Sequence, residues 1–292
     1  MDWVIFFESS IAGLATGAVY ALVALGFVVI YKSTRVINFA LGEIMMFCAY
    51  LFLTFYEIVG LPWWVALIAA LVAGALFGSI TERLVIRPML GESQVSVVMI
   101  TIGLGSVLIG SAELFWSGNP QIIPTYLPDE PIFIGEMYLA PKIAYSAIIA
   151  VAVLSAGLAY FRFSRAGVAF RATASEQKAA FSMGINVPRV FNIAWIAGGM
   201  AMSLAGILVA TSGGLSPQMG AVALSILVVV ILGGLDSILG ALIGGLIVGW
   251  VEIMTAAYLG GEYRLMATFV LLALILVVRP YGLFGTKTVE RL

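Results

Sequence analysis

Long apolar stretches separated by short polar segments form the main pattern along this chain. Nine such stretches cover residues 9–31, 37–59, 62–86, 94–116, 142–163, 190–211, 219–235, 238–258 and 264–279. A helix needs about 20 apolar residues to cross the hydrocarbon core of a bilayer. The seventh stretch barely reaches that length, so we expect a broken or re-entrant segment there. The pattern predicts an all-α, polytopic membrane bundle of about eight or nine transmembrane helices, forming a single domain over 1–292.

The basic residues predict how this bundle is oriented. With residue 1 outside and all nine stretches crossing, only Lys142 and Arg264 fall outside. The other twelve of the 14 basic residues fall on the cytoplasmic side, where an excess of Lys and Arg is expected. They are Lys32, Arg35, Arg83, Arg87, Arg162, Arg165, Arg171, Lys178, Arg189, Arg279, Lys287 and Arg291. This orientation predicts a periplasmic loop at 117–141, a cytoplasmic loop at 164–189 and a cytoplasmic C-terminus.

The cytoplasmic loop contains a short polar segment, TASEQKAAFSMGINVP, at 173–188. Thr173 and Glu176 fit a capping box, which would start a helix here. Gly184 suits the left-handed position after a helix end, and Pro188 would prevent the helix from resuming. We therefore expect a helix of about ten residues at 174–183. It either rests on the membrane as an amphipathic helix or docks into the groove of a partner.

Small residues recur at four-residue spacing within the apolar stretches. The pairs are Gly13/Gly17, Gly74/Gly78, Gly240/Gly244 and Gly245/Gly249. This spacing lets neighbouring membrane helices approach closely, so the pairs predict a compact bundle.

Two glutamates lie on helix faces that also carry small residues. Gly103, Ser106, Gly110 and Glu113 share one face, and Gly245, Gly249, Glu252 and Ala256 share another. A charged side chain facing lipid is costly, so both faces are expected to point into the bundle or a watery cavity. The two glutamates either line the transport pathway or make structural hydrogen bonds.

Two further segments are candidates for the pathway. Asn38, Gly42 and Glu43 lie early in the second stretch, either as an ordinary helix start or exposed to a transport cavity. The Gly- and Pro-rich segment SGGLSPQMG, 212–220, precedes the short seventh stretch and is either a simple loop or an interruption of the kind found in transporters.

Composition supports a membrane protein and excludes several other classes. The 292 residues are 62% hydrophobic and 10% charged, against about 25% charged in soluble domains. The net charge of -1 gives no electrostatic support for nucleic-acid binding. Because there is no histidine and Cys48 is the only cysteine, thiol or histidine metal sites are not expected. The segment GLFGTKT at 282–288 lacks the Gly-Lys pair of a phosphate loop, so any driving nucleotide binds another chain.

Four collinear motifs resemble the LivH-type permeases of bacterial branched-chain amino acid ABC importers. They are GLATGAVYALVALGFVVIYKSTRVINFALGE, ITERLVIRPM, RATASEQKAAFSMGINVPRV and ILGGLDSILGALIGGLIVG. The resemblance implies an inner-membrane import pore made with a second, LivM-like permease. It also implies two LivG/LivF-like ATP-binding subunits, which would carry ATP and Mg, and a periplasmic solute-binding protein. Related permeases serve amides, urea and aromatic acids, so the solute stays open.

The resemblance also implies roles for individual residues. The helix near 174–183 resembles the coupling helix that seats in an ATPase cleft, with Lys178 where many importer permeases have Glu. The implied coupling residues are Glu176, Lys178, Ala179, Ala180, Phe181, Met183 and Gly184. The pathway candidates are Asn38, Gly42, Glu43, Ser106, Glu113 and Glu252. The alternative is a self-sufficient ion-coupled carrier or channel using Glu113 and Glu252; an intramembrane enzyme lacks a nucleophile–base pair.

Overall fold

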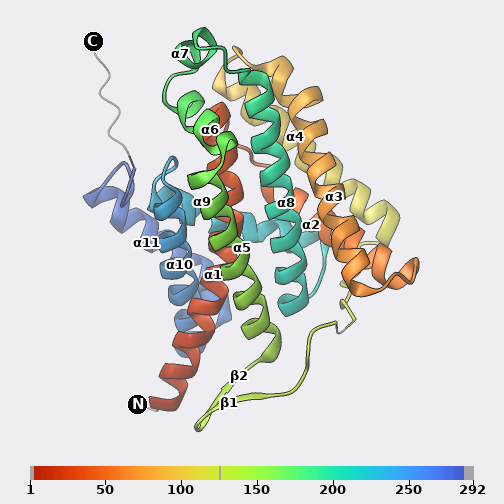
Figure 1. Ribbon diagram of the computed structural model, residues 1–292. Helices are drawn as coiled ribbons and strands as arrows, with labels where there is room; N and C mark the ends of the chain where they lie inside the picture. The colour runs from red at the N-terminus through yellow and green to blue at the C-terminus, as the bar shows by residue number, and fades with distance from the viewer. Residues whose placement is uncertain (1–2, 125, 286–292) are drawn as a thin grey trace. The chain divides into compact units, whose positions relative to one another are not determined.

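The computed structural model describes residues 3–124 and 126–285, and this part of the chain is almost entirely helical (Figure 1). Eight of its helical stretches are long and apolar enough to cross a membrane. They are Trp3–Thr34, Leu41–Ile58, Trp63–Met89, Gln94–Trp116, Pro141–Phe163, Val187–Gly213, Ile238–Tyr258 and Gly261–Val278. The predicted all-α membrane fold is confirmed, and eight of the nine predicted stretches correspond to these helices.

Several of these stretches combine two kinds of helix. α1 (Trp3–Thr34), α4 (Gln94–Trp116), α5 (Pro141–Phe163), α8 (Val187–Gly213) and α10 (Ile238–Tyr258) are single α-helices. α2 (Leu41–Leu53) continues as the π-helix η1 (Thr54–Ile58), and α3 (Trp63–Thr81) continues as η2 (Glu82–Ile86) and η3 (Arg87–Met89). α11 (Arg264–Val278) follows the short turn η5 (Gly261–Tyr263).

The seventh stretch forms a shorter apolar helix, Pro217–Gly233, which is not among the eight candidate spans, and the expected break or re-entrant turn within it stays a prediction. It consists of the 3-10 helix η4 (Pro217–Ala221) and α9 (Val222–Gly233). At 1.5 Å per residue, the 12 residues of α9 rise about 18 Å, which is short of the roughly 30 Å hydrocarbon core.

The chain forms two compact units. The first unit comprises the described parts of 1–28, 127–151 and 224–292, and the second comprises those of 29–126 and 152–223. Each unit draws on segments that are distant in the sequence, so long-range helix packing builds both of them.

In the first unit, the predicted glycine pairs bring α1 against α10. A Cβ on Gly249 would lie 2.4 Å from the Cα of Gly17, and one on Gly17 would lie 2.7 Å from the carbonyl oxygen of Gly245. Only glycine allows backbones to come this close. Gly244 plays the same part between α10 and α9, since its Cβ would lie 2.6 Å from the carbonyl oxygen of Val229.

In the second unit, α8 is the central helix. Gly74 of α3 lies against Gly199, and Gly78 lies against the carbonyl of Trp195. Ser203 donates a hydrogen bond to the carbonyl of Ala70, 2.9 Å away, which fixes the same pair of helices. The packing predicted from the four glycine pairs is therefore confirmed in both units.

The segment between α4 and α5 is partly structured. In the first unit, β1 (Ile132–Ile134) and β2 (Met137–Leu139) form an antiparallel hairpin whose turn has Gly135 at φ 68°. In the second unit, the backbones of Gln121 and Leu215 exchange two hydrogen bonds.

Candidate functional site

The chain loses its helical hydrogen bonds between α1 and α2. Residues 35–40 are not helical, yet Val36, Asn38 and Ala40 are buried. The amide of Phe39 donates to the hydroxyl of Thr101 on α4, at 3.2 Å. Irregular backbone within a membrane bundle is tolerated only where protein or a water-filled cavity satisfies its hydrogen bonds. This break before α2 is therefore a candidate functional site.

The start of α2 lies beside the midpoint of α4. The carboxyl carbon of Glu43 lies 3.4 Å from the position that a Cβ on Gly105 would take. Gly105 is the twelfth of the 23 residues of α4, so a full half-helix of α4 lies on each side of Glu43. The first turn of α2 therefore lies near the middle of a membrane-spanning helix. The helix begins at Leu41, four residues later than the apolar stretch 37–59 predicted.

η4 closes the other side of the first turn of α2. The Oε1 atom of Glu43 lies 3.1 Å from the position of a Cβ on Gly220. A Cβ on Gly42 would lie 2.3 Å from the carbonyl oxygen of Gly220. Glu43 is thus flanked by two glycines, and the Gly- and Pro-rich segment at 212–220 meets the break before α2.

Polar atoms at this helix start lack partners. The side chain of Asn38, which is 3% exposed, accepts a hydrogen bond from the amide of Ala40 at 3.0 Å, but its Nδ2 atom donates to nothing among the described residues. The Oε2 atom of Glu43 is also buried without a partner there. No side chain caps the start of α2. Buried polar groups are nearly always hydrogen-bonded, so these atoms call for an explanation.

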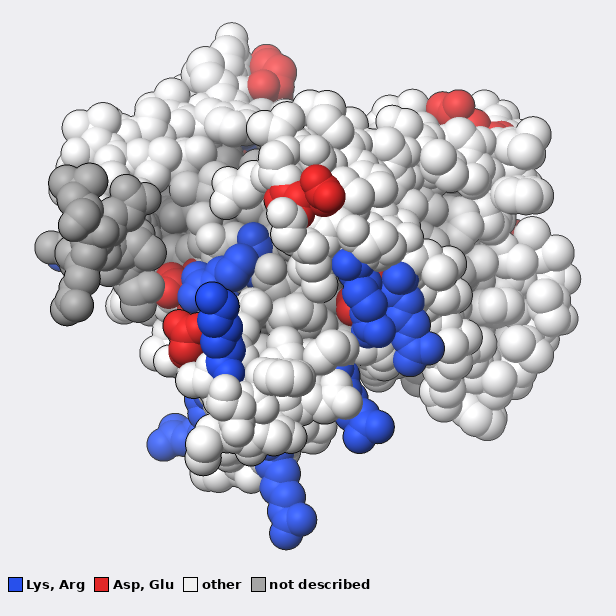
Figure 2. Space-filling view, turned by 90° about the horizontal axis from the view of Figure 1, so that it is seen from above, with Lys and Arg blue, Asp and Glu red and all other residues white. Residues whose placement is uncertain are grey.

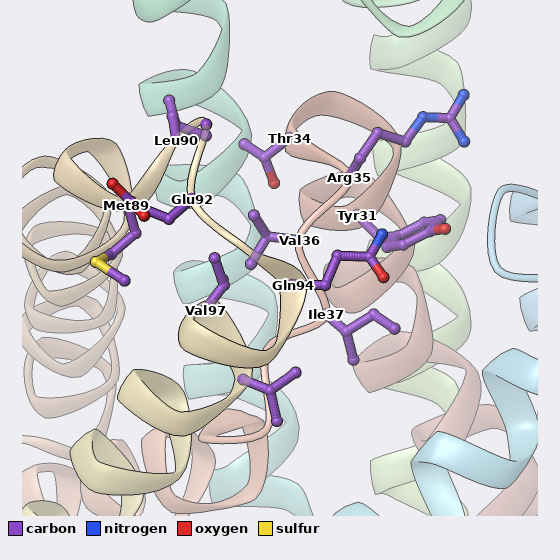
Figure 3. A pocket seen from close by; sticks show the side chains of 12 residues that line it. Tyr31, Thr34, Arg35, Val36, Ile37, Met89, Leu90, Glu92, Gln94 and Val97 are labelled. Carbon is purple, nitrogen blue, oxygen red and sulfur yellow. The ribbon is translucent and has the colours of Figure 1, made fainter.

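A cavity of about 340 Å³ lies beside the break (Figure 3). Tyr31, Thr34, Val36 and Ile37 line it from one side, and the turn between α3 and α4 lines it from the other. The lining includes the first turn of α4 and Ile37, which directly precedes Asn38 in the chain. In Figure 3 the Arg35 side chain points away from the other lining side chains, and its backbone has a left-handed φ of 57°.

Glu252 lies in a different environment, in the first unit. It is 2% exposed, as its predicted inward face requires. Its Oε1 accepts from Ser225 and Thr268, and its Oε2 accepts from Tyr20 at 2.8 Å and from Arg264 at 3.4 Å. These donors lie on α1, α9 and α11, so the carboxylate ties three helices to α10. Tyr20 lies three residues after Gly17, on the glycine face of α1, and that spacing is the signal that identifies this donor from sequence.

The second predicted glutamate face does not point into the bundle of this chain, and its expected place beside a watery cavity stays a prediction. Gly103, Ser106, Gly110 and Glu113 are all exposed on the surface of the chain. α4 instead buries Val97, Thr101, Gly105, Leu108 and Ala112. Glu113 lies one turn from the end of α4. The hydroxyl of Ser106 bonds only to the backbone of its own helix, at Ile102.

The expected ten-residue helix at 174–183 is two helices with a break between them. α6 (Arg165–Ser175) ends before Glu176, which has an extended φ of -152°, and α7 (Gln177–Ser182) follows. The capping box is therefore wrong: Thr173 is buried in the last turn of α6, and no side chain caps α7. Gly184 does adopt the predicted left-handed conformation, at φ 82°. Pro188 lies in the first turn of α8 and helps to start that helix.

α7 exposes two large apolar side chains. Phe181 is 69% exposed and Met183 is 83% exposed, while Glu176, Lys178, Ala179 and Gly184 are also on the surface. Ala180 is 4% exposed and packs within the chain, so among the implied coupling residues it cannot meet a partner directly.

Two hydrogen bonds connect the α6–α7 segment to the end of α1. The guanidinium of Arg35 donates to the backbone carbonyl of Ala174, and the side-chain amide of Gln177 donates to the backbone carbonyl of Ser33, each at 3.3 Å. The segment that carries the exposed apolar pair is therefore in contact with the residues that lead into the break before α2. Nothing in the sequence pattern indicated this contact.

Lys and Arg side chains gather on the face from which α7 projects (Figure 2). In the second unit the basic residues predicted to be cytoplasmic lie at the ends of α1, α3 and α5, in α6 and α7, and at the start of α8. Lys287 and Arg291 lie outside the described residues. Cys48 is buried, and the described residues hold no group of three or more His, Cys, Asp or Glu side chains suited to a metal ion.

Comparisons with known proteins agree over nearly the whole chain. Residues 9–278 match the family described as "Branched-chain amino acid transport system / permease component". The chain is 31% identical to the high-affinity branched-chain amino acid transport system permease protein LivH of Escherichia coli K12, over 98% of this chain and 97% of that protein. It is 30% identical to the corresponding protein BraD of Pseudomonas aeruginosa, over 98% of each.

A solved structure supports the fold. The structure of PsaBC from Streptococcus pneumoniae in complex with Fab aligns with a TM-score of 0.50. The alignment covers 92% of this chain and 91% of the solved chain, at 12% sequence identity. At that identity the likeness concerns the arrangement of helices alone.

Proposed function

Since this chain belongs to the family of permease components of branched-chain amino acid transport systems, we propose that it forms the import path for branched-chain or other hydrophobic amino acids. The match over residues 9–278 carries this proposal, because it spans all eight membrane-crossing stretches. The path is completed by a second permease subunit. The relatives are permease components, so the chain is a transport subunit in a membrane.

The energy for import comes from two separate ATP-binding subunits, which hold ATP and Mg. They dock on α7, where Phe181 and Met183 present apolar surface at the basic face. An excess of Lys and Arg favours the cytoplasm for that face. This orientation leaves the 117–141 loop outside, where a solute-binding protein delivers the amino acid.

The docking movement reaches the membrane through the α6–α7 segment. Gln177 and Arg35 connect this segment to residues 33–35 by hydrogen bonds. A shift of α7 when the ATPases close therefore pulls on the non-helical residues before α2. This biases the permease between inward- and outward-open states, since a partner can shift a conformational equilibrium only through contacts that differ between the states.

The alternative, an ion-coupled carrier, has little support from Glu113 and Glu252, the two glutamates on which it depends. Glu252 already receives four hydrogen bonds, and Glu113 lies one turn from the end of α4 on the exposed face. Neither is an unoccupied buried carboxylate of the kind that would bind and release an ion.

Reconstitution tests the proposal. The chain should co-purify with a second permease and two ATPases. Vesicles that contain this complex and the binding protein should accumulate labelled L-leucine only when ATP is present on the side of the membrane that the ATPases face. The purified chain alone should hydrolyse no ATP. Leucine uptake by the chain alone under an ion gradient would contradict the proposal and support the carrier.

A further inference from the structure

We infer that the first turn of α2 is a binding site for the charged head group of an α-amino acid, with Glu43 holding the ammonium group and Asn38 holding the carboxylate. This inference rests on the proposed function, since it names the place in the path where a zwitterionic substrate is recognised. All of the residues involved belong to the second unit.

The Glu43 carboxyl is suited to a cation. Its Oε2 atom is buried and receives no hydrogen bond from the described residues, and its neighbours Gly105 and Gly220 present no side chain to it. An ionisable side chain deep in a membrane bundle is costly to maintain and marks a functional site by default. A substrate ammonium group has three N–H donors and a positive charge, and it would satisfy this oxygen.

The same helix start offers donors for an anion. The Nδ2 atom of Asn38 is buried without an acceptor, and Asn38 holds the amide of Ala40 through its other side-chain atom, which keeps the group at the helix start. The dipole of a helix N-terminus favours negative charge, and the N-cap residue of α2, Ala40, has no side chain that caps the helix. The donor Nδ2 of Asn38 and the acceptor carboxylate of Glu43 lie on either side of the helix start, and they match the carboxylate and the ammonium group of a zwitterion.

Aromatic rings lie beyond the charged turn. Phe47 follows Glu43 by one turn on the same face of α2, and its ring lies 5.7 Å from that of Trp116. Trp116 in turn stacks on Tyr50 at 5.0 Å. In this proposal Phe47 contacts the side chain of a hydrophobic amino acid whose head group stays at Glu43, while Trp116, the last residue of α4, and Tyr50 lie further along α2.

The location fits a transport site. Broken helices whose termini meet near the bilayer midplane are the usual place for a transporter to bind solute. α2 starts beside the midpoint of α4, and the cavity beside the break ends at Ile37, next to Asn38. The lining of this cavity includes Ile37 but neither Asn38 nor Glu43, so the cavity is adjacent to the proposed site and does not contain it.

A photoreactive substrate tests the location. The reconstituted complex, with both permeases, the ATPases and the binding protein, is illuminated while it transports a diazirine analogue of L-leucine. We expect the label on residues 38–47 or on the segments around Gly105 and Gly220, found by mass spectrometry. A label confined to other segments of this chain would overturn the inference.

Isosteric variants test the chemistry. Glu43→Gln should lower leucine uptake at least about tenfold, because a hydrogen bond to a charged group contributes an order of magnitude or more to affinity. Glu43→Asp, which keeps the charge, should retain more uptake than Glu43→Gln. Asn38→Asp, which removes the free donor and keeps the acceptor, should also lower uptake. The matched controls are Glu57→Gln, an exposed glutamate of the same span, and Asn119→Asp in an exposed turn.

The outcomes separate the two proposals. If the wild-type complex imports no hydrophobic amino acid, the proposed function is wrong and the head-group site falls with it. If the wild type imports leucine and Glu43→Gln transports as well as Glu57→Gln, the head-group site alone is wrong. Co-purification of the ATPases with each variant confirms that the complex has assembled.

Discussion

At the scale of single residues, two glutamates with the same chemistry have opposite surroundings. Glu252 receives hydrogen bonds from Tyr20, Ser225, Thr268 and Arg264, whereas Glu43 keeps one oxygen without a donor among the described residues. A fully satisfied buried carboxylate stabilises the fold, and an unsatisfied one indicates a missing partner. The two side chains should therefore respond differently to substitution.

Glu252→Ala should destabilise the protein by about 2 kcal/mol, because the buried hydroxyls of Tyr20 and Ser225 lose their acceptor and each such bond contributes about 1 kcal/mol, whereas Thr268 can donate to the carbonyl of Arg264 instead. The partly exposed Arg264 adds little. The measurement is the thermal unfolding midpoint of the purified protein in detergent. Glu262→Ala, which changes an exposed glutamate in the turn η5 between α10 and α11, is the control and should leave the midpoint unchanged. An unchanged midpoint with abolished transport would instead assign Glu252 to the pathway.

At the scale of elements, the break at Glu176 decides what the α6–α7 segment can present. α6 continues to Ser175 and buries Phe170, Thr173 and Ala174, while α7 has only six residues. The short helix turns Ala180 inward and leaves Phe181 and Met183 exposed. Docking of a partner on α7 must therefore depend on these two apolar side chains.

Phe181→Asp combined with Met183→Asp should prevent the ATPases from co-purifying, because the two substitutions place charge where apolar side chains would be buried by a partner. The membrane helices should still fold, since both side chains are exposed in the chain itself. Phe133→Asp, which changes an exposed aromatic residue of the β1–β2 hairpin, is the matched control. Normal ATPase binding by the double variant would show that α7 is not the docking element.

At the scale of the whole molecule, the distribution of charge predicts the orientation in the membrane. Asp129 in the 117–141 loop and Lys178 in α7 are both exposed and are predicted to lie on opposite sides of the membrane. Cys48 is buried and can be replaced by alanine to give a cysteine-free background.

In that background, the cysteine introduced by Asp129→Cys should react with a membrane-impermeant maleimide added to intact cells. The cysteine introduced by Lys178→Cys should react only after the cells are permeabilised. The expectation follows from the excess of Lys and Arg in cytoplasmic loops. Protection of position 129 together with labelling of position 178 in intact cells would invert the orientation.

The sequence by itself determined the membrane class, the positions of eight spans and the close packing of the helices. A bilayer requires each spanning segment to satisfy its own backbone and to be apolar over about 20 residues, so eight spans were visible as apolar stretches. The Gly13/Gly17 and Gly245/Gly249 pairs predicted a compact bundle, because this spacing lets neighbouring helices approach closely. The inward face of Glu252 followed from the cost of a charge in lipid.

Only the tertiary structure decided which faces pack and where the helices break. The spans are apolar all round, so periodicity did not show that α4 buries Gly105 and exposes Gly103. The break before α2 is held by Thr101, from a distant helix, and the turn at Glu176 has no local Gly or Pro to announce it. Contacts between segments far apart in the chain place Glu43 between Gly105 and Gly220, and a local pattern carries no information about such contacts.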